Sequence, residues 1–247
     1  MREESKQAIK EANVAVRLAP NAPLPFATRS NAHFYYGDLE AALSDINMAM
    51  KLAPEQFSLL NTRAYIHDAL GDTAAALKDL NTYLEKDSAA FDALLTHAWF
   101  SRNRSLLDSA ENDLHRALDM RPDDVLIQEA LAEVYLRKKY YIKVVEVIEP
   151  MLESNVASAQ AYSMLGLAHS KLGNPAAGLK EVNRAVKIDR YDPRFYFHRA
   201  QIYLELGKKG KACDDLFKAE AMGFSELYDD DTEELQKEAC ESKKGTP

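Results

Sequence analysis

Residues 57–90 read FSLLNTRAYIHDALGDTAAALKDLNTYLEKDSAA, and residues 91–124 read FDALLTHAWFSRNRSLLDSAENDLHRALDMRPDD. Placed one under the other, the two stretches align over 34 residues without an insertion or a deletion. A period of this length indicates an array of similar structural units rather than one irregular core. The same register accommodates six consecutive blocks: 23–56, 57–90, 91–124, 125–158, 159–192 and 193–226.

Each block predicts a helix, a turn and a second helix. When positions within a block are numbered as slots 1 to 34, slots 8 and 20 carry small residues such as Ala64 and Ala76, where two helices approach closely. Apolar residues return at three- and four-residue steps in the second half of the block, which is typical of an amphipathic helix. Slot 15 lies between the two helices, and a glycine there ends the first helix in a left-handed conformation. Four blocks have this glycine: Gly37, Gly71, Gly173 and Gly207.

These features resemble the tetratricopeptide repeat, a 34-residue helix pair with small residues at slots 8 and 20 and proline at slot 32. Pro54 and Pro122 occupy slot 32 here. The resemblance covers residues 23–226 and implies an all-α fold, a right-handed α-solenoid of tandem 34-residue helix-turn-helix repeats. Residues 1–22 match only the second helix of a truncated repeat, because Ala8 and Pro20 fall at slots 20 and 32 of a preceding block. We therefore expect a trimmed or processed fragment of a longer protein.

Residues 227–247 predict an acidic capping helix and tail that follow the last repeat. Acidic residues gather near the expected helix start at Asp231 or Thr232, where they favour the helix dipole. A phosphate or metal site at residues 229–231 is a weaker alternative. Cys213 and Cys240 lie 27 residues apart, so they either bridge the last repeat to its cap in an oxidising compartment or stay free. Sequence reasoning favours free thiols.

A charge pair recurs with the same period. Slots 7 and 23 lie sixteen residues apart, and they face each other if the two helices of a repeat are antiparallel. We interpret the arginines at slot 7 as partners of partly buried carboxylates rather than as anion-binding groups. In the third block His97 takes the arginine position opposite Asp113, and in the fourth both positions are apolar. The predicted structural ion pairs are Arg29 with Asp45, Arg63 with Asp79, and Arg199 with Asp215.

Composition excludes several classes of protein. The formal net charge is −8, which argues against a nucleic-acid binder that neutralises phosphates with a basic surface. Hydrophobic residues make up 47% of the chain, enough for a folded core. No stretch is long and apolar enough for membrane insertion, and the N-terminus lacks the apolar core of a signal peptide. We expect a soluble protein, and the sequence leaves the cytoplasm and the periplasm open.

The search for catalytic chemistry is negative. The chain has no glycine-rich phosphate loop, no HExxH and no GxSxG motif. Of six histidines only His198 lacks a role suggested by the repeat pattern, and we interpret it as a surface residue rather than a general base. We therefore expect a protein that is not an enzyme, with no cofactor and no metal site.

The resemblance implies that the first helix of each repeat lines a concave groove through slots 2, 5, 6, 9, 12 and 13. Aromatic and arginine side chains dominate binding hot spots, and asparagine can hold an extended peptide backbone. The alternative is that Trp99 and Tyr65 are core residues. The candidate partner-binding residues in the first three repeats are Asn31, Phe34, Tyr35, Asn61, Tyr65, Trp99, Arg102 and Asn103.

One binding mode of the family does not fit. Members that hold the acidic tails of chaperones use lysine, asparagine and arginine at five groove positions, and only Asn31 matches here. The remaining positions carry Ala27, Thr62, Asp92 and Thr96.

The leading hypothesis is a non-catalytic scaffold that binds a peptide or protein partner in the groove. A second is an assembly protein that associates with itself through the open repeat edge at residues 1–22. A third is a regulatory fragment of a larger enzyme. Pro150 lies within the second helix of the fourth repeat and predicts a kink that divides the array into residues 1–124 and 159–247.

Overall fold

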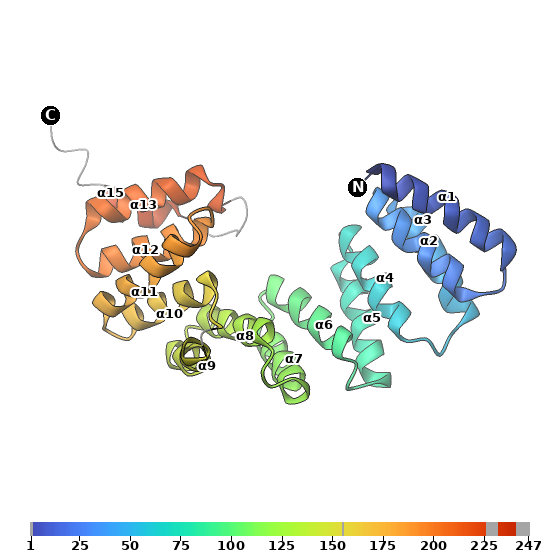
Figure 1. Ribbon diagram of the computed structural model, residues 1–247, viewed down its shortest axis with the longest axis horizontal. Coiled ribbons are helices and arrows are strands. Elements are labelled where there is room, and N and C mark those ends of the chain that lie inside the picture. The colour runs from blue at the N-terminus through green and yellow to red at the C-terminus, as the bar shows by residue number, and fades with distance from the viewer. Residues whose placement is uncertain (1, 155, 226–231, 241–247) are drawn as a thin grey trace. The chain divides into compact units, whose positions relative to one another are not determined.

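The computed structural model describes residues 2–154, 156–225 and 232–240, and throughout these ranges the regular structure is helical (Figure 1). No helix in these ranges is long and apolar enough to cross a membrane. The helices are α1 Arg2–Leu18, α2 Pro23–Tyr36, α3 Leu39–Leu52, α4 Ser58–Ala69, α5 Thr73–Lys86, α6 Phe91–Asn103, α7 Leu107–Met120, α8 Val125–Arg137, α9 Tyr141–Glu153, α10 Ala159–Lys171, α11 Pro175–Ile188, α12 Pro193–Glu205, α13 Lys209–Ala221 and α15 Glu233–Cys240.

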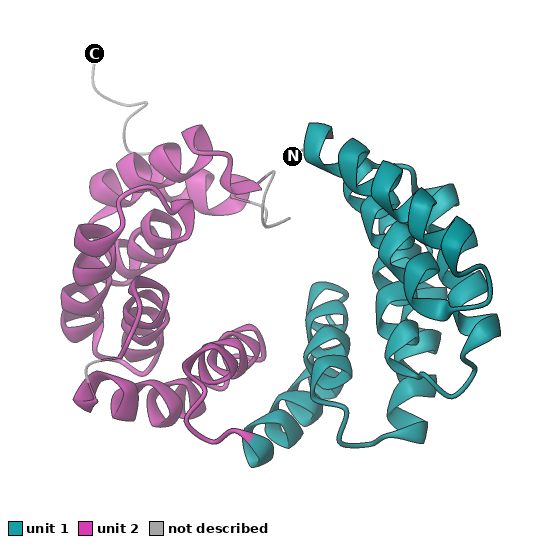
Figure 2. Cartoon of the chain, turned by 45° about the vertical axis from the view of Figure 1, so that its right-hand side comes forward, with its two compact units in different colours: residues 1–120 teal, residues 121–247 magenta. Residues whose placement is uncertain are grey.

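The helices pack in pairs along the chain, as the period predicts. The extensively packed neighbours are α2 with α3, α4 with α5, α6 with α7, α10 with α11, and α12 with α13. The chain forms two compact units, residues 1–120 and residues 121–247, which Figure 2 colours separately. The helix pair α8–α9 belongs to the second unit, where both of its helices contact α10.

The predicted division at the fourth repeat is therefore misplaced. Pro150 lies inside α9, but the boundary between the units comes after Met120, before α8 begins. The physical reason is that α8 and α9 pack on α10, which holds the fourth helix pair within the second unit.

The turn within each repeat follows one backbone rule. At slot 15 the backbone is left-handed in every block, with φ of 97° at Gly37 and 82° at Gly71. Two non-glycine residues adopt the same conformation in the third and fourth blocks, Ser105 at 59° and Lys139 at 61°. After the turn, Asp38 and Asp72 cap the next helix by accepting backbone hydrogen bonds.

Small residues at slots 8 and 20 allow the two helices of a repeat to touch. Ala64 and Ala76 are fully buried in one core cluster with Leu80. The approach is very close between α10 and α11, where a Cβ added at Gly166 would lie 2.7 Å from the carbonyl oxygen of Gly178. Backbone contact of this kind leaves no room for any side chain at slot 8 of the fifth repeat.

The expectation of free thiols is wrong, because Cys213 and Cys240 form a disulfide. Helix α15 packs against α13 and buries Ala239 in the core of the last repeat, which brings the two Cα atoms to 5.2 Å. Their separation along the chain contained no information about this distance. The proposed phosphate or metal site at residues 229–231 lies outside the described residues.

Candidate functional site

The first unit presents an aromatic pair on the first helices of neighbouring repeats. Tyr65 of α4 meets the edge of Phe100 with ring centroids 5.6 Å apart, and Trp99 of α6 contacts the same ring at 4.9 Å. Phe100 is buried, whereas Tyr65 and Trp99 are 42% and 44% exposed. The two outer rings are therefore held by the core without belonging to it, which contradicts the core interpretation of these residues.

A polar group lies beside the aromatic pair. The amide nitrogen of Asn61 donates to Asp92 Oδ2 at 3.3 Å, and Tyr83 Oη donates to Asp92 Oδ1 at 3.4 Å. Burial, helped by the negative charges of Asp92 and Asp87, raises the pKa of Tyr83, so its hydroxyl stays protonated and able to donate. The carbonyl oxygen of Asn61 is buried and accepts no hydrogen bond within the described part of the chain.

Thr96 links the polar group to the rings. Its hydroxyl lies 3.2 Å from the hydroxyl of Tyr65 and donates to the backbone carbonyl of Asp92 at 2.9 Å. Asn61, Tyr65, Asp92 and Trp99 thus lie on one surface of α4 and α6, linked beneath it by buried Thr96, and we call this the α4–α6 surface. Asp92 and Thr96 were not among the predicted site residues, although they occupy groove slots 2 and 6.

The other predicted residues lie at the margins of this surface or on α2. Tyr35 is 76% exposed and Asn31 is also exposed, while Phe34 is partly buried against the core cluster of Ile46. Phe34 and Tyr35 contact each other edge to face at 5.6 Å. Arg102 is partly buried on α6, and Asn103 is exposed at its end.

The arginines at slot 7 meet the carboxylates at slot 23 in the same repeat. Arg29 Nη2 lies 2.6 Å from Asp45, Arg63 Nη2 lies 2.7 Å from Asp79, and Arg199 Nε lies 2.7 Å from Asp215. The hydrogen bond to the carboxylate raises the pKa of Arg29 and of Arg199, against the opposing effect of burial. In the third repeat His97 Nδ1 lies 2.5 Å from Asp113 Oδ2.

Each of these arginines also contacts the preceding repeat, which sequence reasoning missed. Nη1 of Arg29, Arg63 and Arg199 donates to the side-chain oxygen of Asn13, Asn47 and Asn183, at 2.8 to 2.9 Å. These asparagines share slot 25, so the signal was present in the period. In the third and fifth repeats slot 7 lacks arginine while slot 23 keeps an acid, and slot 26 provides the arginine: Arg116 contacts Asp113, and Arg184 contacts Glu181.

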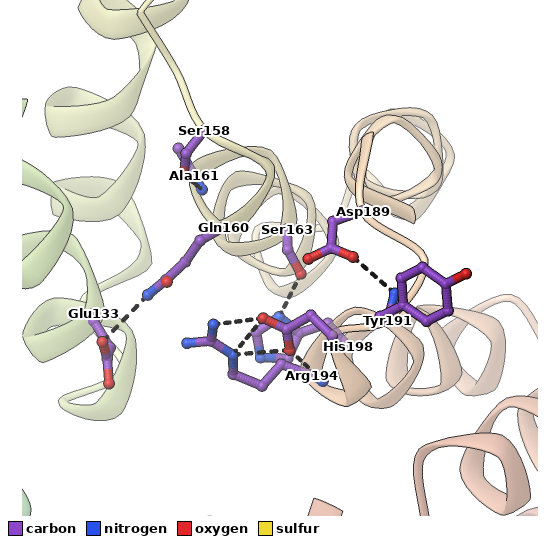
Figure 3. A network of polar contacts seen from close by, with 10 residues as sticks. Glu133, Ser158, Gln160, Ala161, Ser163, Asp189, Tyr191, Arg194 and His198 are labelled. Atoms are coloured by element: carbon purple, nitrogen blue, oxygen red, sulfur yellow. Dashed lines mark hydrogen bonds and ion pairs between the residues drawn. The ribbon is translucent and has the colours of Figure 1, made fainter. Parts of the chain in front are cut away.

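The second unit carries a polar network on its own first helices (Figure 3). Gln160 Nε2 of α10 donates to Glu133 Oε2 of α8 at 3.3 Å, and Ser163 Oγ of α10 lies 2.8 Å from His198 Nδ1 of α12. Arg194 forms a two-point ion pair with Asp192 at the start of α12. Glu133, Gln160, Ser163, Arg194 and His198 occupy groove slots 9, 2, 5, 2 and 6, so the resemblance pointed to these positions as well.

His198 is not the surface residue that the sequence suggested. Its ring is partly buried and bonded to Ser163. Burial, with the positive charge of Arg194, lowers the pKa of His198 to about 4, against a smaller opposing effect of Asp192. The imidazole is therefore neutral at pH 7 and acts as a hydrogen-bonding group that orders α10 against α12.

No group of three or more metal-ligating side chains occurs among the residues that the structure describes. The disulfide and the ion pairs between slots 7 and 23 have structural roles. The α4–α6 surface and the network around His198 hold side chains suited to recognition. Such arrangements bind and orient, through aromatic area and through donors and acceptors.

Two family models, both described as tetratricopeptide repeat, match residues 30–100 and 153–229. The chain belongs to the tetratricopeptide repeat family. It resembles the crystal structure of a tetratricopeptide repeat protein from Parabacteroides merdae, with a TM-score of 0.70 and 21% identity over 96% of this chain and 93% of that one. The fold recurs in YrrB, described as a tetratricopeptide repeat protein with an unusual peptide-binding site. There the TM-score is 0.57 and the identity 16%, over 81% of this chain and 97% of that one.

A curated relative is the cellulose synthase operon protein C of Pseudomonas fluorescens. The two sequences are 32% identical over 123 residues, which is 49% of this chain and 10% of the relative. The matched half of this tetratricopeptide repeat chain thus spans about a tenth of that relative's length.

Proposed function

We propose that this tetratricopeptide repeat chain is a non-catalytic scaffold that binds a peptide or protein partner on the groove face of its first helices. The α4–α6 surface carries the proposal. Tyr65 and Trp99 present large apolar area with few rotatable bonds, and both are anchored on buried Phe100, so little conformational entropy is lost on binding. Aromatic residues supported in this way are typical of protein-binding hot spots.

The polar side chains beside the aromatic rings would orient a bound partner through hydrogen bonds. The carboxylate of exposed Asp92 on α6 offers an acceptor for a backbone N–H of a partner, and the hydroxyl oxygen of exposed Tyr65 on α4 offers a second. Extended peptides present donors at regular intervals, which suits acceptors carried on neighbouring helices. The occurrence of a peptide-binding site in YrrB agrees with this use of the fold.

The test is capture of binding partners by immobilised wild-type chain and by a Tyr65→Ala, Trp99→Ala double variant. We expect partners retained by the wild type to be lost by the double variant. A Tyr191→Ala, Phe217→Ala variant removes exposed aromatic area in the second unit and serves as the matched control, since these side chains are 71% and 56% exposed. Identical retention by all three proteins would exclude the α4–α6 surface.

A titration gives an independent readout, because Trp99 is the only tryptophan of the chain. Binding over its exposed half should shift the emission maximum to the blue. An identified partner that binds without changing this emission would bind elsewhere.

The second candidate function is self-association through α1. Val14 and Leu18 are 44% and 81% exposed on this helix, and α1 packs on α2 with its opposite face. Light scattering of the wild type and of a Val14→Lys variant tests it. Concentration-dependent dimers that Val14→Lys abolishes would favour assembly, and a monomer at all concentrations would exclude it.

We also propose that the chain matures in an oxidising compartment, such as a periplasm. The disulfide between Cys213 and Cys240 supports this, because such bonds persist where thiols are not kept reduced. In protein isolated from its native cells under acid quench, Cys213 and Cys240 should take up maleimide only after reduction, which mass spectrometry of the labelled peptides would show. Label at both cysteines before reduction would contradict the proposal.

A further inference from the structure

The turns within the repeats differ in charge between the two units. In the second unit, slots 14 to 19 comprise residues 138–143, 172–177 and 206–211, which contain six lysines and no acidic residue. The corresponding segments of the first unit contain one arginine and four acidic residues. The basic segments stand out in a chain whose net charge is −8. The lysines are Lys138, Lys139, Lys143, Lys208, Lys209 and Lys211.

The three segments lie along one edge of the second unit, which we call the basic edge. Leu136, two residues before the first segment, and Leu206, the first residue of the third segment, pack against one core cluster around Leu167. Lys171 and Glu205, at the ends of α10 and α12, form an ion pair at 2.7 Å. The turns of successive repeats are therefore neighbours, and their lysines belong to one surface.

The side chains of the basic edge reach solvent. Lys139, Lys143, Lys208, Lys209 and Lys211 are exposed. Lys138 and Lys143 lie over the ring of Tyr140, at 5.0 and 5.4 Å from its centroid. Attraction to the ring holds two ammonium groups close together at the tip of the fourth repeat.

The third, fourth and sixth repeats depart from the local rules that the first, second and fifth repeats obey. Lys139 takes the left-handed position that glycine occupies in four repeats, which strains a residue with a side chain. Tyr140 and Lys208 occupy the N-cap position, where Asp38, Asp72 and Asn174 accept a backbone hydrogen bond, and neither forms such a cap.

A purely structural explanation covers only part of this pattern. Lysines after the end of α8 favour the helix dipole, so Lys138 and Lys139 have a stabilising role there. Lys209 and Lys211, however, lie in the first turn of α13, and Lys143 lies in the first turn of α9, where positive charge opposes the dipole. Neither helix has an acidic residue in its first turn. Local departures without structural compensation are typical of functional surfaces.

We propose that the basic edge is a second docking surface, distinct from the groove face, which binds an acidic polypeptide segment. The charge complementarity determines this class of partner, because the edge presents two groups of cations, on the turns of the fourth and sixth repeats, on either side of the uncharged turn of the fifth. A lipid surface fits less well. The exposed large aliphatic side chains of these three segments are Ile142 and Leu172, 63% and 46% exposed, which is a small apolar area beside six lysines.

The test uses a fluorescein-labelled peptide of twelve glutamates and follows its anisotropy at low and at raised salt. The variant combines Lys139→Gly, Tyr140→Asp and Lys208→Asp, which restores the glycine and the caps of the other repeats. We expect the dissociation constant to rise at least about tenfold, while the thermal midpoint rises by roughly 2–4 °C per restored cap. Weaker binding in a more stable protein separates loss of the surface from loss of the fold.

The matched control is Lys10→Glu with Lys78→Glu, two exposed lysines of the first unit whose reversal changes the net charge by the same −4. It should leave binding within about twofold. An equal loss of peptide affinity in both variants would show that only the net charge of the protein matters, and it would overturn the proposal. The proposal would also be overturned if the wild type did not bind the glutamate peptide. Binding of phosphatidylglycerol vesicles in place of the peptide, with release by Ile142→Ser, would identify a lipid surface instead.

Discussion

Arg63 and Asp79 form a two-point ion pair within one repeat: Nε donates to Oδ2 and Nη2 to Oδ1, both at 2.7 Å. Asp79 is 6% exposed, so its carboxylate depends on the guanidinium for compensation of its lost hydration. The same geometry recurs at Arg29 with Asp45 and at Arg199 with Asp215. The pair is thus a component of the repeat and not an accident of one site.

Replacing Arg63 by leucine should lower the free energy of unfolding by about 2–4 kcal/mol, because Asp79 is left buried without a cation. Replacing both residues by leucine should cost less, since no uncompensated charge remains. Urea denaturation of the two variants measures the difference. Equal losses would show that the carboxylate does not need the arginine.

Asn47→Ala should cost about 1 kcal/mol by removing the hydrogen bond from Arg63 to the preceding repeat. Asn81→Ala is the matched control. Asn81 occupies the same slot, but the following repeat has His97 in place of arginine. Urea denaturation should show a loss for Asn47→Ala only, and similar losses would remove the proposed coupling between repeats.

Gly166→Ala should destabilise the protein by about 1–3 kcal/mol, because the new Cβ would lie 2.7 Å from Gly178 O and 3.0 Å from Val182 N. Gly210→Ala, within α13, meets nothing within 4 Å and should stabilise by roughly 0.5–1 kcal/mol through helix propensity. Thermal unfolding distinguishes the two signs. A neutral Gly166→Ala variant would mean that α10 and α11 separate without cost.

Reduction of the disulfide between Cys213 and Cys240 should remove about 3 kcal/mol, as expected for a loop of 27 residues. Thermal unfolding with and without dithiothreitol measures this loss. The Cys240→Ala variant should match the reduced protein and should not respond to the reductant. A response of that variant would show that the reductant acts elsewhere.

Protonation of His198 should weaken the fold in mild acid. Its pKa is about 4 in the folded chain and about 6.5 when unfolded, so the unfolded state binds more protons between these values. The contribution of neutral His198 to the free energy of unfolding is therefore fully present above pH 6.5. It is lost as the pH falls toward 4, which lowers the free energy of unfolding by about 1–3 kcal/mol. Urea denaturation across this range should show a shallower decline for His198→Gln, and parallel curves would contradict the low pKa.

Sequence reasoning was accurate where a position repeats. The ion pairs follow from antiparallel helices, and the left-handed turn follows from glycine at slot 15. The asparagines at slot 25 have the same periodic signal, but each bonds to an arginine of the next repeat, and the pairing rule for two helices of one repeat does not reach that contact. The partial exposure of Tyr65 and Trp99 could not be predicted in this way, because the residue at slot 9 varies between repeats and no periodic pattern constrains it.

The 34-residue period by itself determined the helical repeat fold, because each unit buries its apolar face only against its neighbours and so must repeat its small and apolar residues at constant spacing. The tertiary structure alone decided which distant residues meet. Cys240 reaches Cys213 because α15 packs on α13, and His198 loses its charge because burial and the nearby charge of Arg194 lower its pKa. Both depend on distances in space, which the spacing of residues along a chain does not specify.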